Sequence, residues 1–309
     1  MKSGGKEYHT PVMVEQVIDF LQCRSDGLYV DATVGGGGHA QAILNASKPS
    51  GRLIGIDRDP DAVKTARENL SKFGDRANVL HGVFSRIGEL LFEQRISCVD
   101  GVLLDLGVSS YQLDTPLRGF GFGVSGILDM RMDQNSGRCA ADILQNIDEG
   151  ELSKMIFELG EERYARRIAR AIAERRKKTP IETTDELANV VTSAIPAAKR
   201  RGRIHPATRT FQALRIYVND ELGELKRFLD AAPELLCPGG RLVIMSYHSL
   251  EDRLVKRAFR MWEAKGGYRV ITKKIVTSSE TQQRENPKSR SAKLRVLEKE
   301  KHGIELHSC

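Results

Sequence analysis

The sequence predicts a doubly wound α/β fold with a parallel sheet and an inserted helical domain. Between residues 28 and 106, apolar β-type runs alternate with helix-compatible segments, as in parallel strands joined by right-handed crossovers. The alternation then stops, and it resumes at about residue 208. With 309 residues, 40% of them hydrophobic, the chain can form one large domain or two unequal ones.

The first part of the chain predicts strands and helices in strict alternation. The strands are expected at residues 28–34, 52–57, 77–81 and 99–105, and the helices at residues 38–46, 60–72 and 86–94. Asp59 followed by Pro60 indicates the start of the second helix, because aspartate caps helices and proline is tolerated at the first helical position.

A glycine-rich turn follows the first predicted strand. Asp31 closes the apolar run, glycines occupy positions 35–38, and His39 follows them. The next apolar run ends in Asp57, about twenty residues after the glycines, which is the layout of a nucleotide-type cofactor site. Glycines let the backbone approach a ligand, and the second carboxylate can accept hydrogen bonds from ribose hydroxyls. A run of four glycines costs too much conformational entropy for a turn without a ligand.

The spacing alone leaves the cofactor open. Gly35-x-Gly37-x-x-Ala40 fits the dinucleotide fingerprint, so NAD is one candidate. Asp31 favours S-adenosylmethionine instead, because a carboxylate there would repel a pyrophosphate bound at the helix N-terminus. S-adenosylmethionine has no phosphate, and a carboxylate stabilises its sulfonium and its ammonium.

Carboxylates also recur at the ends of the predicted strands. Asp31, Asp57 and Asp105 each stand where such a strand ends. Ligands of open α/β sheets bind beyond the carboxyl ends of the strands. We therefore expect these three side chains to share one ligand-binding edge.

The middle of the chain predicts a different architecture. Residues 107–132 are rich in glycine and polar groups, and residues 137–200 read as helices only, one of them expected at 161–178. The predicted domains are 1–132 and 208–309 for the α/β part and 133–207 for the helical insertion.

The last part of the chain returns to the α/β pattern. It predicts a long helix over residues 210–236 with a break near Pro233, a strand at 241–247 and a helix at 248–262. Ser249 and Asp252 have the spacing of a capping box at the start of that last helix. Strands near 268–272 and 291–298 are expected to close the sheet as a hairpin.

Composition bounds the class of protein. The formal net charge of +7 is compatible with a polyanionic partner. The five cysteines show no short Cys-x-x-Cys spacing, which favours a reducing compartment over a disulfide framework or a zinc site, and no metal is expected. The sequence shows neither a signal-peptide pattern nor an apolar run long enough for a membrane span, so we expect a cytoplasmic protein.

Several long, irregular motifs resemble one known family across about residues 8–297. They are Tyr8-His9-x-Pro11-Val12, Asp31-Ala-Thr-Val-Gly-Gly-Gly-Gly-His39, Asp105-Leu-Gly-Val-Ser-Ser110-x-Gln112, Leu128-Asp-Met-Arg-Met-Asp133, Gly160-Glu-Glu-Arg-Tyr-Ala-Arg-Arg167, His205-Pro-Ala-Thr-Arg-Thr-Phe-Gln-Ala-Leu-Arg215, Tyr247-His-Ser-Leu-Glu-Asp-Arg253 and Asn286-Pro-Lys-Ser-Arg-Ser-Ala-Lys-Leu-Arg295. The chain thus resembles the RsmH/MraW family, the ribosomal RNA small subunit methyltransferases H. It departs from the family pattern at Gly36, at Tyr247 and at Ser125–Ile127.

The resemblance implies a Rossmann-like class I methyltransferase sheet and methylation by S-adenosylmethionine. The implied acceptor is the exocyclic amino nitrogen (N-4) of one cytidine in the decoding region of 16S rRNA, within the small ribosomal subunit. The cofactor contacts implied by the motifs, besides Asp31, are Gly37, Gly38, His39, Asp57, Phe84, Asp105 and Gln112.

The chemistry of an exocyclic amine suggests two catalytic candidates. Methylating such a nitrogen requires an acceptor for its proton. Asp105 ends the fourth predicted strand, but the Pro-Pro-aromatic sequence that other amino-methylating enzymes have at this position does not follow it. Asp105 either accepts the proton or only holds the cofactor. His248 directly follows the fifth parallel strand and is the second candidate, with a helix-starting role as the alternative.

Other residues are candidates for contacts with RNA. Asp129 and Arg131 contact an extruded cytidine or order their loop as ion pairs, and Tyr111, Phe120 and Phe122 are candidate stacking partners. The candidate phosphate contacts are Arg163, Arg167, Arg170, Lys199, Arg200, Arg201, Arg203, Lys288, Arg290, Lys293 and Arg295.

There are two alternative hypotheses to an rRNA cytidine methyltransferase. One is a methyltransferase for DNA or protein, and the other is a non-catalytic ribosome-assembly factor. The absence of a Pro-Pro-aromatic sequence after Asp105 weighs against ordinary DNA amino-methylation. The intact Asp31, Gly35–Gly38, Asp57 and Asp105 weigh against a non-catalytic factor. A homo-oligomer remains compatible with the sequence.

Overall fold

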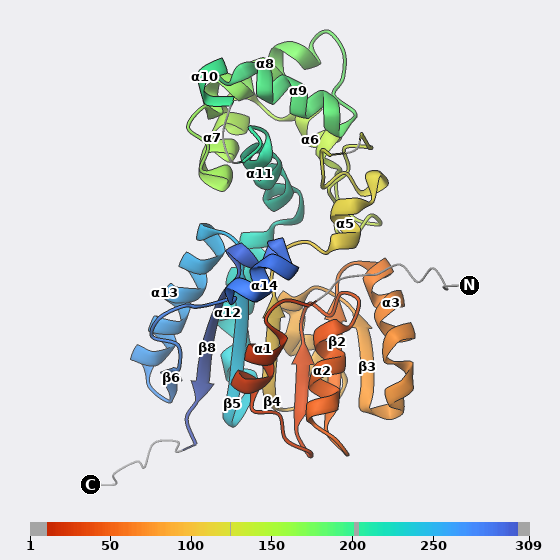
Figure 1. Ribbon diagram of the computed structural model, residues 1–309, viewed down its shortest axis with the longest axis vertical. Coiled ribbons are helices and arrows are strands. Elements are labelled where there is room, and N and C mark those ends of the chain that lie inside the picture. Colours follow the sequence, from red (N-terminus) through yellow and green to blue (C-terminus); the bar gives the residue numbers. More distant parts are fainter. Residues whose placement is uncertain (1–10, 124, 201–203, 302–309) are drawn as a thin grey trace. The chain divides into compact units, whose positions relative to one another are not determined.

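The computed structural model describes residues 11–123, 125–200 and 204–301, which form two compact units (Figure 1). One unit comprises the chain up to Gly107 and the chain from Leu222 onward, and it contains the sheet. The other comprises Val108–Glu221 and is helical. Within the described ranges, no helix is long and apolar enough to cross a membrane.

The strands of the sheet unit form one mixed sheet in the order β3-β2-β1-β4-β5-β8-β6, and Figure 1 shows them side by side. The strands are β1 (Leu28–Asp31), β2 (Arg52–Asp57), β3 (Ala77–His81), β4 (Val99–Asp105), β5 (Leu236–Ser246), β6 (Tyr268–Val270), β7 (Val276–Thr277) and β8 (Lys293–Lys299). Strands β1 to β5 are parallel, whereas β8 runs antiparallel to β5, β6 and β7. The strand order reverses between β1 and β4, which is the switch point of a doubly wound sheet.

Two apolar cores cover the two faces of this sheet. Alternate residues of β4 point to opposite sides, so Leu104 joins one core and Leu103 the other. On the Leu104 side lie α4 (Ile87–Glu93), α12 (Glu221–Ala231) and α13 (Ser249–Lys265). On the Leu103 side lie α1 (Val14–Leu21), α2 (Gly38–Ala46) and α3 (Pro60–Leu70). The shorter helical segments of this unit are α14 (Glu280–Glu285) and the 3-10 turns Ser71–Arg76, Phe84–Arg86, Ala232–Leu235 and Pro287–Ser291.

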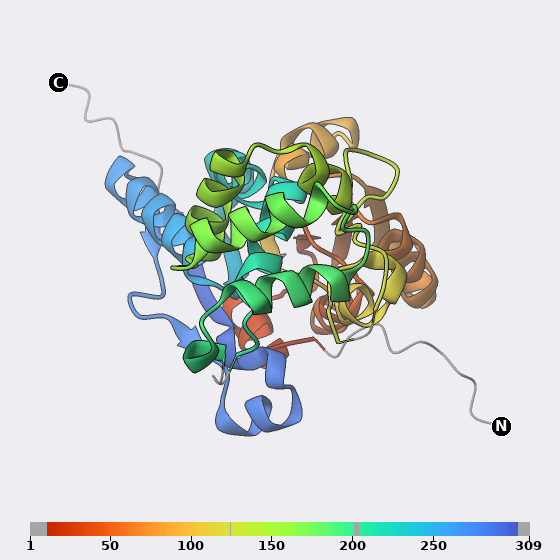
Figure 2. The same cartoon turned by 90° about the horizontal axis from the view of Figure 1, so that it is seen from above.

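The helical unit has a core of its own. Its helices are α5 (Ser110–Asp114), α6 (Ala140–Asn146), α7 (Glu149–Gly160), α8 (Ala165–Arg176), α9 (Thr184–Ala194), α10 (Ala197–Arg200) and α11 (Thr208–Asn219), with a 3-10 turn at Pro116–Arg118. Helices α11, α7, α8 and α9 pack in that sequence, and Figure 2 shows α8 beside α9. The long loop before α6 contributes Phe120, Leu128 and Met130 to the core.

The helical unit extends beyond the expected insertion of residues 133–207. It begins at Val108 because the loop expected to belong to the α/β part contributes apolar side chains, among them Leu128 and Met130, to the helical core. Arg118 connects two parts of that loop by donating to the carbonyls of Arg131 and Met132. It ends at Glu221 because α11 packs against α7.

The strands and helices expected for residues 28–105 are confirmed with small changes of boundary. Strand β1 ends at Asp31 rather than at residue 34, and Asp59 caps α3 by accepting a hydrogen bond from the backbone N–H of Asp61 at 3.0 Å. The closing strands β6 and β8 pair antiparallel, as expected.

Three expectations were wrong. The single helix over 210–236 is two helices, because Asp220 is in the left-handed conformation (φ 48°) and ends α11. The helix expected from residue 161 begins at Ala165, because Glu161 is also left-handed (φ 50°) and ends α7. Cys98 and Cys237 form a disulfide between β5 and the residue preceding β4, although the cysteine spacing gave no sign of a pair.

Candidate functional site

Three aspartates lie at the carboxyl ends of neighbouring strands. Asp31 ends β1, Asp57 ends β2 and Asp105 ends β4. Since β1 lies between β2 and β4, with Asp31 in register with Gly55 and Leu103, the three carboxylates follow one edge of the sheet. The predicted acidic edge is therefore confirmed, and it stands at the switch point where ligands of such sheets bind.

The glycine turn connects this edge to α2. Gly35 (φ 51°) and Gly37 (φ 84°) are left-handed, a conformation that side chains other than glycine rarely adopt. Gly38 has no such angle, but a Cβ there would stand 3.0 Å from Cγ of Pro11. Asp57 stabilises the conformation of this turn, because its Oδ2 accepts a hydrogen bond from the backbone N–H of Gly35 at 2.9 Å.

Asp31 is a buried carboxylate with an unused oxygen. Only 1% of the residue is exposed. Its Oδ1 accepts from the backbone N–H of Thr33 at 3.3 Å, whereas Oδ2 has no hydrogen-bond partner among the described residues. Burial raises the pKa of Asp31 to about 7, against the opposing charge of His39. An unpaired buried carboxylate is costly unless a cationic ligand completes the site.

Asp57 also carries a perturbed carboxyl group. Its Oδ1 accepts from the backbone N–H of Asp59 at 2.9 Å, in addition to the contact with Gly35. Burial raises the pKa of Asp57 to about 6, and the two backbone hydrogen bonds oppose that shift. Because each carboxylate oxygen has two acceptor positions, these contacts leave capacity for ligand hydroxyls.

Asp105 lies between a histidine and a tyrosine. Tyr247 donates its phenol hydrogen to Oδ1 of Asp105 at 2.7 Å, and Nε2 of His39 lies 3.5 Å from Oδ2. Nε2 of His39 is buried and makes no hydrogen bond within the described chain. In the sequence, Tyr247 stands out only as a departure from a family pattern, because nothing local shows that it reaches Asp105.

The two remaining predicted cofactor residues lie in different units. Phe84 opens a 3-10 turn of the sheet unit and packs edge to face on Phe228, with ring centroids 5.5 Å apart. Gln112 lies in α5 of the helical unit, where its side-chain oxygen accepts from the backbone N–H of Ser109 at 3.1 Å. That contact belongs to a capping box.

His248 is the N-cap of α13. Its Nδ1 accepts from the backbone N–H of Glu251 at 3.4 Å, and its Nε2 lies 3.1 Å from Oε1 of Glu251. Oε2 of Glu251 accepts from the backbone N–H of His248 at 3.3 Å, which completes a capping box. The box expected from Ser249 to Asp252 is therefore displaced by one residue, and the structure gives His248 its helix-starting role.

Asp129 and Arg131 form an ion pair that orders their loop. Nε and Nη2 of Arg131 donate to the two oxygens of Asp129 at 2.7 and 2.8 Å. Gln134 adds a hydrogen bond to Oδ2 of Asp129 at 3.1 Å, and these contacts lower the pKa of the buried Asp129 carboxyl. This corresponds to the loop-ordering alternative.

The candidate phosphate contacts fall into two groups. Exposed residues are Arg163, Arg167, Arg170, Lys199, Arg200 and Arg290, although Arg170 pairs with Glu174 and Arg200 donates to the carbonyls of Ser193 and Ile195. Arg201 and Arg203, as well as the side chain of Lys288, lie outside the described part of the chain. Lys293 is half-buried, 3.9 Å from Asp252. Arg295 is a correction: it is only 8% exposed and its Nε donates to Asp252 at 2.7 Å, so it cannot contact phosphate.

The candidate stacking residues are largely occupied. Phe120 belongs to the buried core of the helical unit, and Phe122 stacks on His205 with centroids 4.5 Å apart. Tyr111 is half-buried in α5.

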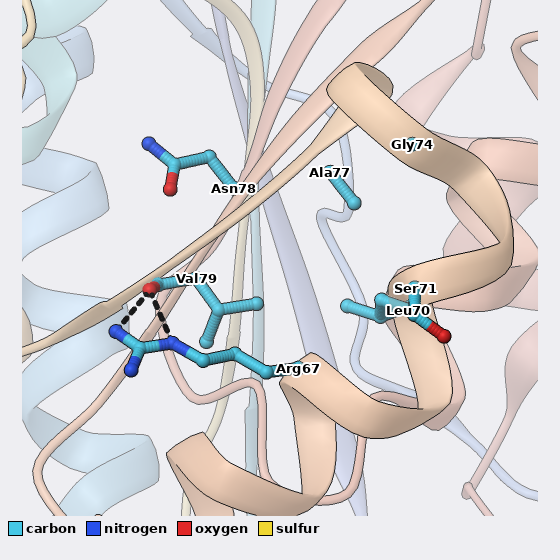
Figure 3. A pocket seen from close by; sticks show the side chains of 7 residues that line it. All are labelled: Arg67, Leu70, Ser71, Gly74, Ala77, Asn78 and Val79. Atoms are coloured by element: carbon cyan, nitrogen blue, oxygen red, sulfur yellow. Dashed lines mark hydrogen bonds between the residues drawn. The ribbon is translucent and has the colours of Figure 1, made fainter.

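A separate groove of about 350 Å³ lies between α3 and β3, where Figure 3 shows Arg67 reaching the carbonyl of Val79. Its lining residues are Arg67, Leu70, Ser71, Gly74, Ala77, Asn78 and Val79. None of the three strand-end aspartates lines it, so this groove is not the ligand site predicted from the sequence.

The acidic edge fits a cationic nucleoside cofactor. Asp31 offers an unpartnered oxygen to a positive charge, and Asp57 follows the next strand at the position suited to ribose hydroxyls. A dinucleotide fits less well, because Asp31, Asp57 and Asp105 would face its pyrophosphate. The sheet order, its antiparallel strand beside β5 and this edge together define a class I S-adenosylmethionine-dependent methyltransferase.

Comparison with known proteins identifies the family. The MraW methylase family model matches residues 6–300, and the chain belongs to this family. The ribosomal RNA small subunit methyltransferase H of Syntrophobacter fumaroxidans is 47% identical, over 97% of this chain and 99% of the relative. The protein of the same name from Pelobacter propionicus is 50% identical, over 94% of this chain and 98% of the relative.

Solved structures with similar folds are more distant. Fibrillarin of Aeropyrum pernix, solved with bound S-adenosylmethionine, has a TM-score of 0.39 and 11% identity, over 90% of this chain and 68% of the other. An S-adenosylmethionine-dependent O-methyltransferase of Thermotoga maritima has a TM-score of 0.42 and 10% identity, over 94% of this chain and 66% of the other.

Proposed function

We propose that this protein transfers a methyl group from S-adenosylmethionine to N-4 of one cytidine in the decoding region of 16S rRNA, within the small ribosomal subunit. Membership of the MraW methylase family and the name shared by its relatives support the class of substrate. The observation that carries the cofactor assignment is the buried, unpartnered Oδ2 of Asp31 at the acidic edge.

The residues proposed to hold the cofactor lie mainly along that edge. Asp31 and Asp105 would face its positive charges, Asp57 its ribose hydroxyls, and the Gly37–Gly38 turn with His39 would close the site. The motif match adds Phe84 and Gln112. When bound, S-adenosylmethionine supplies an electrophilic methyl group on a sulfonium.

Asp105 is proposed to accept the proton of the reacting amine. The lone pair of an exocyclic cytosine amine is delocalised into the ring, so positive charge must not accumulate on the nitrogen as the new bond forms. Asp105 offers a carboxylate at the end of β4, with Oδ1 bound by Tyr247 and Oδ2 turned toward His39. His248 is a weaker candidate because both of its ring nitrogens face Glu251.

Contact with RNA is assigned mainly to the helical unit. Its exposed cations include Arg163, Arg167, Lys199 and Arg200. We assign Arg201 and Arg203 to the same basic run, and the Asp129–Arg131 pair to holding the adjacent loop in a fixed conformation. The small ribosomal subunit is the proposed partner, because a basic surface favours a phosphate backbone.

The test is nucleoside mass mapping of 16S rRNA. Small subunits from a strain that lacks this gene would be incubated with the purified protein and S-adenosylmethionine carrying a deuterated methyl group. We expect one labelled N-4-methylcytidine, located by oligonucleotide mapping to the decoding region. Parallel reactions with free 16S rRNA and with DNA would establish whether the assembled subunit is the preferred acceptor.

Two controls sharpen this experiment. Asp105→Asn keeps the shape of the side chain but removes the proton acceptor, so we expect at least a hundred-fold slower transfer, roughly the contribution of a general base. Asp61→Asn removes a carboxylate from the exposed first turn of α3 and should have no effect. Label on the ribose, on a ring carbon or on protein would refute the proposed specificity.

A further inference from the structure

Tyr247 lies directly against the carboxylate proposed to accept the proton. It follows β5, and its phenol donates to Oδ1 of Asp105 at 2.7 Å. The register of β4 and β5 pairs Asp105 with Met245, so the contact joins the ends of two neighbouring strands. Gly107 packs beside the ring, since a Cβ at Gly107 would stand 3.3 Å from Cδ2 of Tyr247. The phenol is thus held by the sheet and by the chain that leaves β4.

The Tyr247 phenol stays protonated, and so remains a hydrogen-bond donor, over the pH range in which carboxylates titrate. Burial raises its pKa well above the ordinary value, and the negative charge of Asp105 and the hydrogen bond to it act in the same direction. A phenol O–H that donates to a carboxylate stabilises the charged form of that carboxylate over its protonated form. It also fixes the orientation of the carboxylate, so Oδ2 is the oxygen left for another partner.

The other groups around Asp105 do not replace this donor. His39, from α2, lies 3.5 Å from Oδ2 and makes no hydrogen bond there. Asp31, from β1, is itself acidic, so its charge repels that of Asp105. Glu251, from α13, is also acidic, and its charge raises the pKa of Tyr247, as the charge of Asp105 does. Among the described residues, Tyr247 is the side chain that donates a hydrogen bond to the Asp105 carboxylate.

We propose that Tyr247 is a positioning residue for Asp105, which holds Oδ1 of that carboxylate so that Oδ2 is oriented to receive the proton of the cytidine amine. This role rests on the function proposed above.

The first test compares the single-turnover rate of methyl transfer to small subunits with the affinity for S-adenosylhomocysteine. Tyr247→Phe removes only the hydroxyl. The variant should transfer the methyl group about ten-fold more slowly, because the carboxylate loses its fixed orientation, while its affinity for S-adenosylhomocysteine stays within about two-fold of the wild type. Tyr268→Phe is the matched control, since Tyr268 donates to the backbone carbonyl of Pro233 in the same unit. Equal single-turnover rates for Tyr247→Phe and wild type would overturn the proposal.

The second test needs no methyl transfer. A phenol proton held by the largely buried Asp105 carboxylate should give a downfield proton resonance in the cofactor-free protein. We expect that signal to be present in the wild type and Tyr268→Phe, and absent from both Tyr247→Phe and Asp105→Asn. If the protein methylates cytidine but shows no such resonance, the positioning role alone is overturned. A protein with the resonance that methylates no cytidine would overturn the proposed function, and the role in proton acceptance with it.

Discussion

At the scale of single residues, Asp31 shows a conflict between stability and ligand binding. The free protein buries this carboxylate with one oxygen unpartnered, and burial raises its pKa to about 7. In the unfolded chain the same group has its ordinary pKa near 3.8. The folded state therefore holds the proton more tightly, so Asp31 favours folding at low pH, and this contribution is lost as the pH rises from about 4 to 7.

Asp31→Asn should consequently stabilise the cofactor-free protein at about pH 8. We expect the free energy of unfolding to rise by about 2–4 kcal/mol there and by much less near pH 5, because the neutral amide avoids the cost of a buried charge. Urea denaturation at both pH values measures this difference. Titration calorimetry without RNA should show at least ten-fold weaker S-adenosylmethionine binding. A stability change that does not depend on pH would contradict this account.

The same carboxylate should make cofactor binding depend on pH. A cationic ligand prefers the ionised form of Asp31, so its affinity for the wild type should fall as the pH drops below about 7. In Asp31→Asn this dependence should flatten. Binding isotherms in buffers of different ionisation enthalpy would also report proton release on binding, and a wild type that releases no proton near pH 6 would be inconsistent with the assignment.

Asp57 differs from Asp31 because both of its oxygens already accept backbone hydrogen bonds. Asp57→Ala should weaken cofactor binding by about ten- to a hundred-fold, since it removes the proposed ribose contact and releases the Gly35 turn. Asp57→Asn separates the two effects, because its amide can still accept one backbone hydrogen bond. Calorimetry that shows unchanged affinity for Asp57→Ala would refute the assignment.

At the scale of secondary-structure elements, the start of α13 shows what sequence patterns can and cannot locate. The sequence predicted a helix here and a capping box one residue too late. The structure uses His248 and Glu251, because the imidazole Nδ1 accepts a backbone N–H as a serine hydroxyl would. Histidine is not among the preferred capping residues, so the usual Ser-x-x-Asp pattern was the more conspicuous signal.

His248→Asn tests capping against catalysis. Asparagine is a good N-cap, so this variant should keep both the free energy of unfolding, within about 0.5 kcal/mol, and the rate of methyl transfer. His248→Ala should lose about 1 kcal/mol of stability, measured by urea denaturation. An inactive but fully stable His248→Asn protein would show that the imidazole takes part in the reaction.

Periodicity predicted most strands and helices, but not their tertiary partners. Strands 52–57, 77–81 and 99–105 were predicted with the observed bounds, because apolar runs bounded by polar residues leave few alternatives. The break at Asp220 was missed, because a left-handed aspartate between two amphipathic helices leaves no periodic mark. Arg295 was taken for a phosphate contact because its partner Asp252 is distant in sequence.

The acidic edge was predictable and the Asp105–Tyr247 pair was not. Each aspartate follows an apolar strand, so sequence order alone places all three on one edge. The hydrogen bond between Asp105 and Tyr247 depends on the register of β4 against β5, which the sequence does not contain.

At the scale of the whole molecule, the two units have separate roles in the proposed function: one binds the cofactor and the other contacts RNA. The sheet unit carries the acidic edge, and the helical unit carries the exposed cations Arg163, Arg167 and Lys199. Cofactor affinity and affinity for the ribosomal subunit should therefore be separable by mutation.

Charge reversal at Arg163 and Arg167 tests this separation. The double change to glutamate should weaken binding to the small subunit at least ten-fold and reduce the slope of affinity against salt, while cofactor affinity stays unchanged. Reversal of Lys273 and Lys274, exposed in the sheet unit, changes the net charge equally and serves as the control. Filter binding over a range of salt concentrations measures both. Equal effects of the two double variants would indicate only a general charge effect.

The pairing of β4 with β5 has a consequence for how the chain folds. These neighbouring strands are separated in sequence by the entire helical unit, so their pairing closes a very long loop. The entropic cost of loop closure grows with loop length, and such distant pairings form slowly. Because the insertion has its own core, its early collapse would shorten the effective distance between the two strands. We therefore expect mutations in the helical core to slow the formation of the sheet.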